Sequence, residues 1–205
     1  MNHHEVNEMF LQGCSFRRLS LLLLCGLFAG ALAQAQQRTF ELDPAQTKVN
    51  FSVDSTLHTV HGTFQLKRGR IRFDSVTGQA GGELVVDSTS GQGGNGSRDK
   101  RMHKKILESP KYSDIVFTPE HIKGAVAADG KSQVDVEGRL AMHGESRPMT
   151  LTMQLQLQGG AGSADTEFSV PYQKWGMKNP GTFILRVSDK VDLHVHAIGR
   201  FIAVP

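Results

Sequence analysis

Most of the chain from residue 38 onward alternates between apolar and polar side chains with a period of two. The clearest run, MTLTMQLQL at residues 149–157, places Met or Leu at every odd position and Thr or Gln at every even one. Such alternation is typical of β-strands with one buried and one solvated face. Four further runs show the same pattern, at residues 48–55, 59–66, 133–142 and 190–201.

Shorter and weaker apolar runs lie between these strands. They are found at residues 38–42, 70–74, 82–88, 114–118, 121–127 and 166–172. Segments rich in Gly, Asp and Ser separate many of the runs, and such segments predict tight turns. Nine or ten short strands with almost no helix predict an all-β fold, an antiparallel barrel or a sandwich. We favour a barrel, because consecutive hairpins form an up-and-down meander and closure removes exposed sheet edges.

Flexible and aromatic side chains are frequent on the apolar face of these strands, for example Phe51, Phe64, Met142, Met153 and Phe168. Side chains of these types most often fill a solid β core. An eight-stranded barrel can also hold one small ligand, and Met adapts well to an irregular apolar surface. Alternation does not distinguish a filled interior from a hollow one, so the pattern by itself favours the filled core.

The segment RDKRMHKKILE, residues 98–108, interrupts the strand pattern and predicts one short internal helix. We expect Ser97 to cap this helix, and its acidic first turn and lysine-rich last turn suit the helix dipole. Met102, Ile106 and Leu107 form a narrow apolar stripe along it. A helix this short is marginal alone, so we expect it to dock on the barrel as a plug or a lid over one opening.

Residues 1–35 have the three parts of a secretory signal peptide. Two arginines precede an apolar run at residues 19–32, and small residues follow that run. The run is shorter than the roughly 20 apolar residues that span a bilayer, so we expect cleavage after Ala33 or Ala35 rather than a membrane anchor. The prediction is a periplasmic protein, not an integral membrane protein, with residues 36–205 as its single domain.

The charge and the cysteine content of the predicted mature chain exclude some classes of function. The signal segment contains two basic and two acidic residues, so the remaining chain keeps a formal net charge of +3. That charge lacks the strong basic field of a nucleic-acid-binding protein, and we expect no nucleic-acid partner. Both cysteines, Cys14 and Cys25, lie in the signal segment, so the domain is expected to have no disulfide and no thiolate metal site.

Histidines raise an alternative function, a metal-binding or redox and stress accessory protein. His194 and His196, with Asp192, share one face of the last predicted strand, a geometry that copper or zinc can use. No third or fourth ligand is identifiable, and this face is opposite the apolar one, so exposed polar residues are the simpler interpretation. His58 and His61 are three apart and would face opposite sides of a strand. We therefore predict no metal and no cofactor.

Enzyme activity has no positive support in the sequence. His143 lies at a predicted turn, and a catalytic histidine would need a nucleophile and an orienting carboxylate beside it. Ser146 and Glu145 are close in sequence, but no nucleophile elbow or oxyanion loop is readable. The glycine-rich segment at residues 91–97 lacks the Lys-Ser/Thr ending of a phosphate-binding loop. We therefore expect a protein that is not an enzyme.

Four stretches of the sequence resemble the YceI family of exported polyisoprenoid-binding proteins. The two most specific are residues 94–122, which contain an Arg-Asp pair with an apolar residue three positions on, and the hairpin GRLAMHGESRPMTL at residues 138–151. Residues 47–64 resemble the family's opening hairpin, and residues 170–199 resemble the C-terminal part of one branch. The resemblance extends over residues 38–202.

The resemblance implies a lipocalin-like antiparallel β-barrel, whose elongated apolar cavity holds an isoprenoid or other long-chain amphiphile. Our leading hypothesis is a periplasmic carrier that binds this ligand without chemical change. The resemblance names no cofactor and leaves a homodimer open. Arg98 and Asp99 match the family's Arg-Asp pair, and together with His143 they are candidates for a structural role or for binding a head group. Eight residues of the apolar stripe are the candidates for contact with the lipid tail: Phe51, Val53, Phe64, Leu140, Met142, Leu151, Met153 and Phe168.

Overall fold

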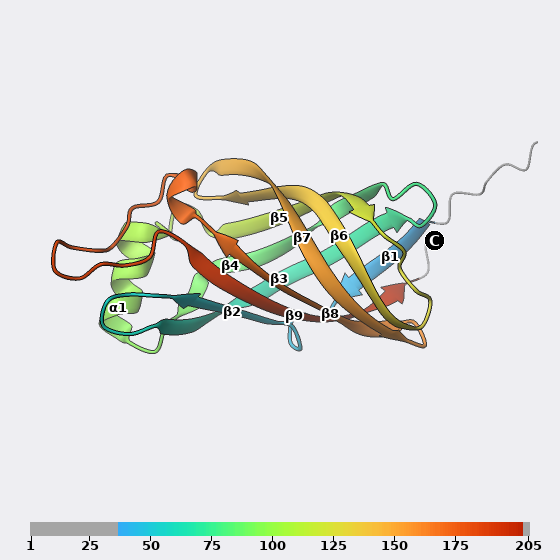
Figure 1. The fold of residues 1–205 in the computed structure, drawn as a ribbon, viewed down its shortest axis with the longest axis horizontal. Helices are drawn as coiled ribbons and strands as arrows, with labels where there is room; N and C mark the ends of the chain where they lie inside the picture. Colours follow the sequence, from blue (N-terminus) through green and yellow to red (C-terminus); the bar gives the residue numbers. More distant parts are fainter. Residues whose placement is uncertain (1–36, 203–205) are drawn as a thin grey trace, which may run out of the picture. The chain divides into compact units, whose positions relative to one another are not determined.

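Residues 37–202 are described by the computed structural model, and within them nine strands form one antiparallel sheet that closes into a barrel (Figure 1). The strands are β1 (Gln37–Leu42), β2 (Lys48–Val53), β3 (Val60–Asp74), β4 (Ala80–Gln92), β5 (Asp114–Lys123), β6 (Gly130–Met142), β7 (Glu145–Gln158), β8 (Ala161–Val170) and β9 (Val191–Ile202). The same residues contain α1 (Gly96–Arg101), the π-helical η1 (Met102–Ile106) and the 3₁₀-helical η2 (Tyr172–Trp175). The predicted all-β barrel with a short internal helix is confirmed, whereas the predicted signal peptide lies outside the described residues.

The strands of this described part occupy eight positions around the barrel, because β1 and β2 share one position between β3 and β9. β2 pairs with residues 60–64 of β3 and 192–196 of β9. β1 pairs with the other ends of the same two strands, at residues 70–74 and 199–202. The break between them, residues 43–47, contains a proline, which cannot donate to a strand ladder. The pairing of both segments with β9 closes the sheet.

The structure joins two of the predicted strands in the first half of the barrel. The predicted strands at residues 59–66 and 70–74 form a single strand, β3. Its pairing with β4 shifts register between Leu66 and Arg68, and both Lys67 and Arg68 are exposed. A bulge of this kind breaks the period-two pattern, because the residues beyond it point to the opposite faces from those that strict alternation would assign. The sequence pattern therefore indicates two strands where the chain forms one.

The internal helix begins earlier than predicted. Asn95, not Ser97, is the N-cap, and its side-chain oxygen accepts a hydrogen bond from the N–H of Arg98 at 3.0 Å. Asn and Ser are both favourable N-cap residues. The prediction therefore named the right kind of residue but placed the start of the helix two residues too late. After α1 the chain continues through the wider turn of η1, in which the N–H of Leu107 donates to the carbonyl of Met102 at 2.9 Å. Such π-turns are rare and occur frequently at functional sites.

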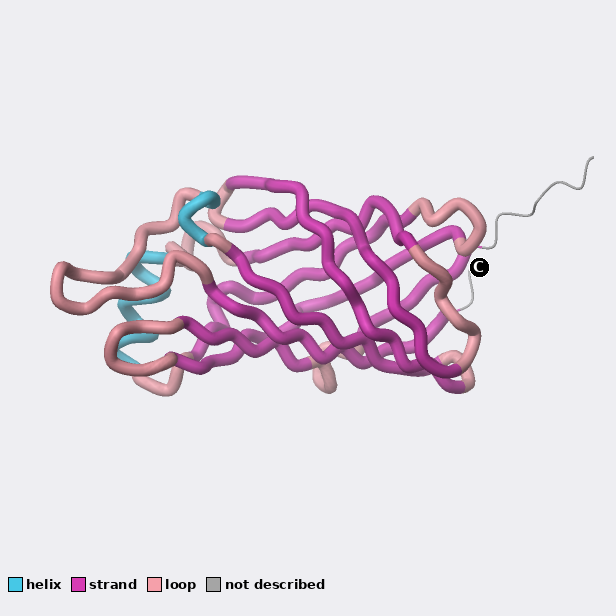
Figure 2. Tube along the Cα trace, in the orientation of Figure 1, coloured by secondary structure: helices cyan, strands magenta, loops and turns pink. Residues whose placement is uncertain are grey.

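The long connections between strands lie at one end of the barrel, which we call the mouth end. The mouth end consists of residues 54–59, 93–113, 143–144 and 171–190, and the opposite end of residues 75–79, 124–129 and 159–160. The helical pieces α1, η1 and η2 all belong to mouth-end connections, at the left of Figure 2. Functional residues in proteins often lie on such loops, held in place by a rigid scaffold.

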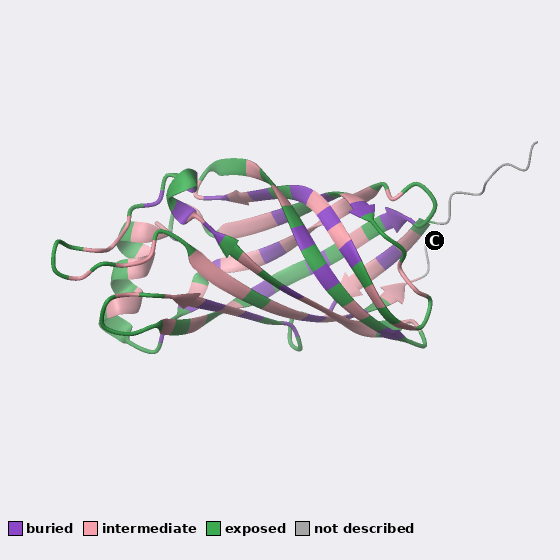
Figure 3. Cartoon of the chain, in the orientation of Figure 1, coloured by how far each residue is buried: buried purple, intermediate pink, exposed green. Residues whose placement is uncertain are grey.

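Buried and exposed residues alternate along the strands, as the period-two pattern predicts (Figure 3). In β7 the Met and Leu residues from 149 to 157 are buried or half-buried, and the Thr and Gln residues between them are exposed. The buried residues form one large cluster that includes Trp175 and Met177, and a small separate cluster of Leu42, Leu66 and Ala197. Several inward-facing residues, among them Leu84, Phe168 and Leu193, are only half-buried, so the interior is not evenly filled.

The hairpin between β6 and β7 is a two-residue turn that requires left-handed backbone at both positions. His143 has a φ of 52° and Gly144 a φ of 82°. This geometry matches the right-handed twist of the flanking strands, and glycine adopts it without a steric cost. A β-carbon on Gly144 would also lie 3.1 Å from the ring of Tyr112.

We expect Gly144→Ala to lower the free energy of unfolding by about 1–2 kcal/mol, because a side chain disfavours the left-handed region by about that amount. Urea denaturation measures this change. Gly81→Ala is the matched control, since Gly81 lies outside the positive-φ region and a β-carbon there meets no atom within 4 Å. Equal stability of the two variants would contradict the assignment of a strained turn.

Candidate functional site

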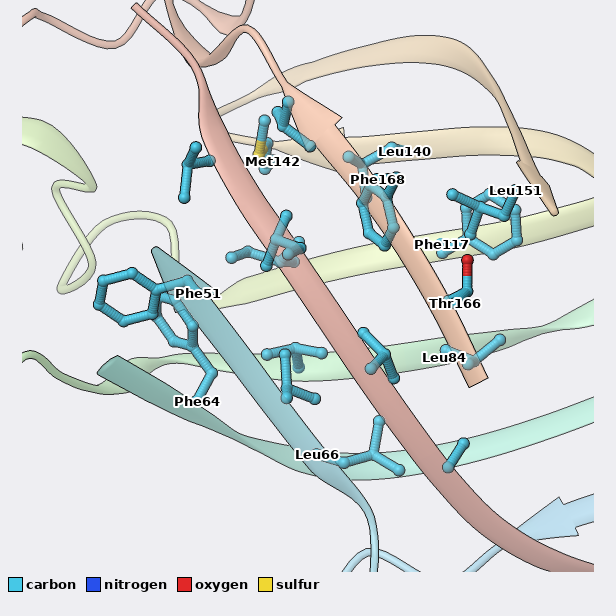
Figure 4. A pocket seen from close by; sticks show the side chains of 18 of the residues that line it. Phe51, Phe64, Leu66, Leu84, Phe117, Leu140, Met142, Leu151, Thr166 and Phe168 are labelled. Atoms are coloured by element: carbon cyan, nitrogen blue, oxygen red, sulfur yellow. The ribbon is translucent and has the colours of Figure 1, made fainter. Parts of the chain in front are cut away.

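The barrel encloses an apolar cavity of about 470 Å³ (Figure 4). The cavity extends from Phe73 and Phe201, near the end opposite the mouth end, to His58 and Arg98 at the mouth end. This volume is within the range of about 300–1,000 Å³ that is typical of small-molecule sites. The interior is therefore hollow, as the family resemblance implied and as alternation alone could not reveal.

All eight residues that the sequence singled out for the lipid tail lie on the wall of this cavity: Phe51, Val53, Phe64, Leu140, Met142, Leu151, Met153 and Phe168. They come from β2, β3, β6, β7 and β8, and several of them are labelled in Figure 4. The wall also includes Leu66, Leu84 and Leu193, which the prediction left out. Leu193 has the same alternating pattern as the eight, so the sequence signal for it was present.

One polar group lies among these apolar side chains without a partner. Thr166, in the middle of β8, is only 7% exposed, and its hydroxyl makes no hydrogen bond to the described protein. Figure 4 shows Thr166 among the apolar side chains of the cavity wall. Threonine is common in β-strands, so the sequence does not indicate that this residue is buried in the cavity wall. The hydroxyl is therefore a feature of the cavity that only the structure reveals.

Arg98 and Asp99 stand where the cavity reaches the mouth end, and both side chains hold the backbone of Gly93. The Asp99 carboxylate accepts a hydrogen bond from the Gly93 N–H at 2.8 Å, and the Arg98 guanidinium donates to the Gly93 carbonyl. Another guanidinium nitrogen of Arg98 lies 3.5 Å from Nε2 of His58. The Nε of Arg98 is buried and has no hydrogen-bond partner within residues 37–202. The pair thus fixes the start of the helical connection.

The apolar stripe of the helical connection faces the cavity. Met102, Ile106 and Leu107 all line it, at the end of the barrel where α1 stands in Figure 1. His103 anchors this connection, because its two ring nitrogens lie 2.9 Å from the hydroxyl of Ser109 and 2.8 Å from the carbonyl of Gly91. The connection therefore contributes one wall of the cavity at the mouth end.

The connection between β8 and β9 is held by large buried side chains. Trp175 donates a hydrogen bond from Nε1 to the carbonyl of Leu140 at 3.0 Å, and Met177 is buried beside it. The hydroxyl of Tyr172 donates to the carbonyl of Ser188 at 2.7 Å. Burial, and secondarily the carboxylate of Asp189, raises the pKa of Tyr172, so the hydroxyl stays protonated and remains a donor.

His143 is not on the wall of the cavity. Its ring lies against Tyr112, with 4.5 Å between ring centroids, and its Nδ1 is 3.1 Å from the carbonyl of Trp175. Its Nε2 is 4.0 Å from the carboxylate of Glu108. These contacts join three of the mouth-end connections, so the geometry of His143 is that of a structural link between loops.

The histidines of the last strand do not converge with further ligands. Nδ1 of His196 lies 2.6 Å from the carboxylate of Asp165, and Nε2 of His194 lies 3.8 Å from it. Asp192 accepts instead from Ser169. His61 is exposed on β3, away from His58 at the cavity. Over residues 37–202, no group of three or more His, Cys, Asp and Glu side chains is placed to hold a metal ion.

No helix among the described residues has the length and hydrophobicity that crossing a bilayer requires.

Two solved structures share this fold at low sequence identity. BcnA of Burkholderia cenocepacia aligns with a TM-score of 0.62 over 77% of this chain and 98% of its own, at 17% identity. A polyisoprenoid-binding domain from Saccharophagus degradans, implicated in plant cell wall breakdown, aligns with a TM-score of 0.62 over 78% of this chain and 97% of its own, at 18% identity. At these identities the likeness shows a common fold.

Curated relatives cover most of the same barrel. A UPF0312 protein of Vibrio cholerae serotype O1 is 24% identical over 180 residues, which are 82% of this chain and 88% of the relative. The protein YceI of Escherichia coli O157:H7 is 26% identical over 144 residues, 69% of this chain and 73% of the relative. The family model of the YceI-like domain matches residues 40–198. This chain therefore belongs to the YceI-like family.

Proposed function

We propose that this protein is a periplasmic carrier, which holds the apolar tail of an isoprenoid or another long-chain amphiphile in the barrel and does no chemistry on it. The observation that carries the proposal is the apolar cavity, which runs along the barrel to the mouth end. Its wall is built almost entirely from aliphatic and aromatic side chains. The Saccharophagus degradans domain of the same fold, which binds polyisoprenoid, supports this ligand class.

Burial of the tail supplies the binding energy in this proposal. Each methylene that leaves water for an apolar site contributes about 0.8 kcal/mol, so a long tail needs few polar contacts. The wall offers little that would discriminate one hydrocarbon from another, because hydrophobic contact is not directional. The carrier is therefore expected to select its ligand mainly by the length and thickness of the tail.

The polar groups at the mouth end suit an anionic head group. Arg98 and Arg101 both border the cavity there, and the Nε of Arg98 has no partner among the described residues. A guanidinium donates readily to phosphate or carboxylate oxygens. A tail bound inside the barrel would place its head group beside these two arginines, with the head toward solvent.

The proposal that the protein does not react with its ligand is supported by the side chains that line the cavity. The hydroxyl of Thr166 has no hydrogen-bond partner among the described residues, so no base is placed to activate it. Nucleophilic catalysis by a hydroxyl needs such a base. The periplasmic location rests on the predicted signal peptide at residues 1–35.

Replacing Leu193 with Trp should reduce the lipid that co-purifies with the protein several-fold. Leu193 is half-buried and faces the cavity, so the larger side chain would occupy space that the tail needs. Organic extraction followed by mass spectrometry measures the lipid content, and native mass spectrometry measures the occupied fraction.

Glu167→Trp is the control for this substitution, since Glu167 is exposed on the neighbouring strand β8 and is not part of the cavity wall. Its lipid content should equal that of the unmodified protein. Thermal melting checks that both variants are folded. No co-purified lipid in the unmodified protein, or full occupancy in folded Leu193→Trp, would refute tail binding in the cavity.

Thr166→Val should stabilise the ligand-free protein by on the order of 1 kcal/mol, because it removes a buried hydroxyl that has no partner. The affinity for geranylgeranyl phosphate, measured by titration calorimetry, should stay the same or rise, since only the hydrocarbon tail reaches this depth. A loss of affinity of about tenfold, which corresponds to about 1.4 kcal/mol, would contradict this orientation. It would indicate that a polar ligand atom accepts a hydrogen bond from Thr166.

A further inference from the structure

The positive charge of the barrel is concentrated at the mouth end. The four mouth-end connections contain ten Lys and Arg residues and four Asp and Glu residues, a formal charge of +6. The rest of residues 37–202 contains eleven Lys and Arg residues and fourteen Asp and Glu residues, a formal charge of −3. The small net charge is therefore unevenly distributed along the barrel, and the positive charge lies at the mouth end, which the cavity reaches.

Large apolar side chains are exposed at the same end. Phe183 is 100% exposed and Ile184 is 90% exposed, at the tip of the connection between β8 and β9. This tip is the red loop that projects furthest to the left in Figure 1. Leu57, on the neighbouring connection, is 76% exposed and also borders the cavity. Exposed apolar side chains gathered in one place usually mark a surface that contacts a partner or a membrane.

Hydrogen bonds hold this apolar tip in place at the rim of the barrel. A turn from Thr182 to Leu185 forms the tip, with the N–H of Thr182 donating to the Leu185 carbonyl at 2.7 Å. Below the tip, the N–H of Thr56 donates to the carbonyl of Arg186 at 3.0 Å. Arg101 of α1 donates to the carbonyl of Pro180 at 3.3 Å. The apolar tip is therefore presented on a fixed base, with cationic side chains directly behind it.

We propose that the mouth end docks on the surface of an anionic lipid bilayer. Phe183 and Ile184 insert among the lipid head groups, and the surrounding Lys and Arg side chains contact the anionic lipids. Apolar side chains backed by Lys and Arg are the combination that binds such interfaces. In this orientation the cavity opens toward the bilayer, from which the tail of a lipid could enter. The entry of a lipid tail from the bilayer rests on the proposed carrier function, whereas the docking itself does not.

A second copy of this chain fits the surface less well. Two mouth ends brought face to face would oppose two formal charges of +6, and like charges across an interface are unfavourable. An anionic bilayer complements both features of the surface at once, the apolar tip and the positive charge around it. We therefore assign the bilayer as the occupant.

Vesicle flotation tests the docking directly. The unmodified protein should float with vesicles of equal parts phosphatidylcholine and phosphatidylglycerol, and much less with phosphatidylcholine alone. High salt should weaken the binding, because it screens the charges. The double variant Phe183→Ser/Ile184→Ser should bind the mixed vesicles at least about tenfold more weakly, because the inserted apolar area supplies part of the affinity.

Val76→Ser is the matched control, since Val76 is 65% exposed on a turn at the opposite end of the barrel. This variant should bind the vesicles like the unmodified protein. No flotation of the unmodified protein, unchanged binding of the double variant, or equal losses in both variants would overturn the proposal. A dimer in light scattering that the double variant dissociates would also overturn it, because the tip would then be an interface between copies.

Lipid extraction from the same samples separates this test from that of the carrier function. Phe183 and Ile184 do not line the cavity, so the double variant should keep its co-purified lipid while it loses vesicle binding. Vesicle binding by a protein that carries no lipid would refute the carrier and leave the docking intact. Lipid content without any vesicle binding would refute the docking alone.

Discussion

The closure of the sheet is the constraint on which the rest of the structure depends. β9 pairs on one side with β8 and on the other with β2 and β1, so that a sheet with apolar side chains on one face becomes a tube with those side chains inside. Eight strand positions give an interior just wide enough for side chains or one small ligand. Here the inward-facing side chains leave a cavity of about 470 Å³ unfilled. The cavity is thus a consequence of closure combined with incomplete filling.

The two ends of the barrel are built differently, and this difference positions the site. The opposite end has short turns, whereas the mouth end has the helical connection and the connection between β8 and β9. Both are fastened by specific contacts: His103 binds the helical connection to Gly91, and Trp175 binds the other to Leu140. His143 joins the two, through Trp175 on one side and Tyr112 on the other. The loops at the rim of the cavity are consequently connected to one another and to the strands by specific contacts.

The sequence predicted the strands and the cavity wall well, because both follow from a period of two. Each of the eight proposed lining residues faces the cavity for that reason. The bulge in β3 was not predicted, because it shifts the alternation of buried and exposed residues by one position while the chain continues as the same strand. The helix cap at Asn95 joins residues only three apart, and the prediction placed it two residues too late. The unpaired hydroxyl of Thr166 depends on the absence of any partner from distant parts of the described chain. Whether the interior was hollow depended on the summed packing of all strands, and alternation along one strand does not contain that information.

The sharing of one barrel position by β1 and β2 has a kinetic consequence. The closing contacts join residues 39–42 to residues 199–202, nearly the whole length of the described chain apart. Contacts this distant in sequence form slowly, because the entropy of a large loop must be lost before they contribute. The barrel cannot close until its last strand, residues 191–202, is available. In the export that we propose, late closure is an advantage, because the chain can be threaded through a membrane before the barrel forms.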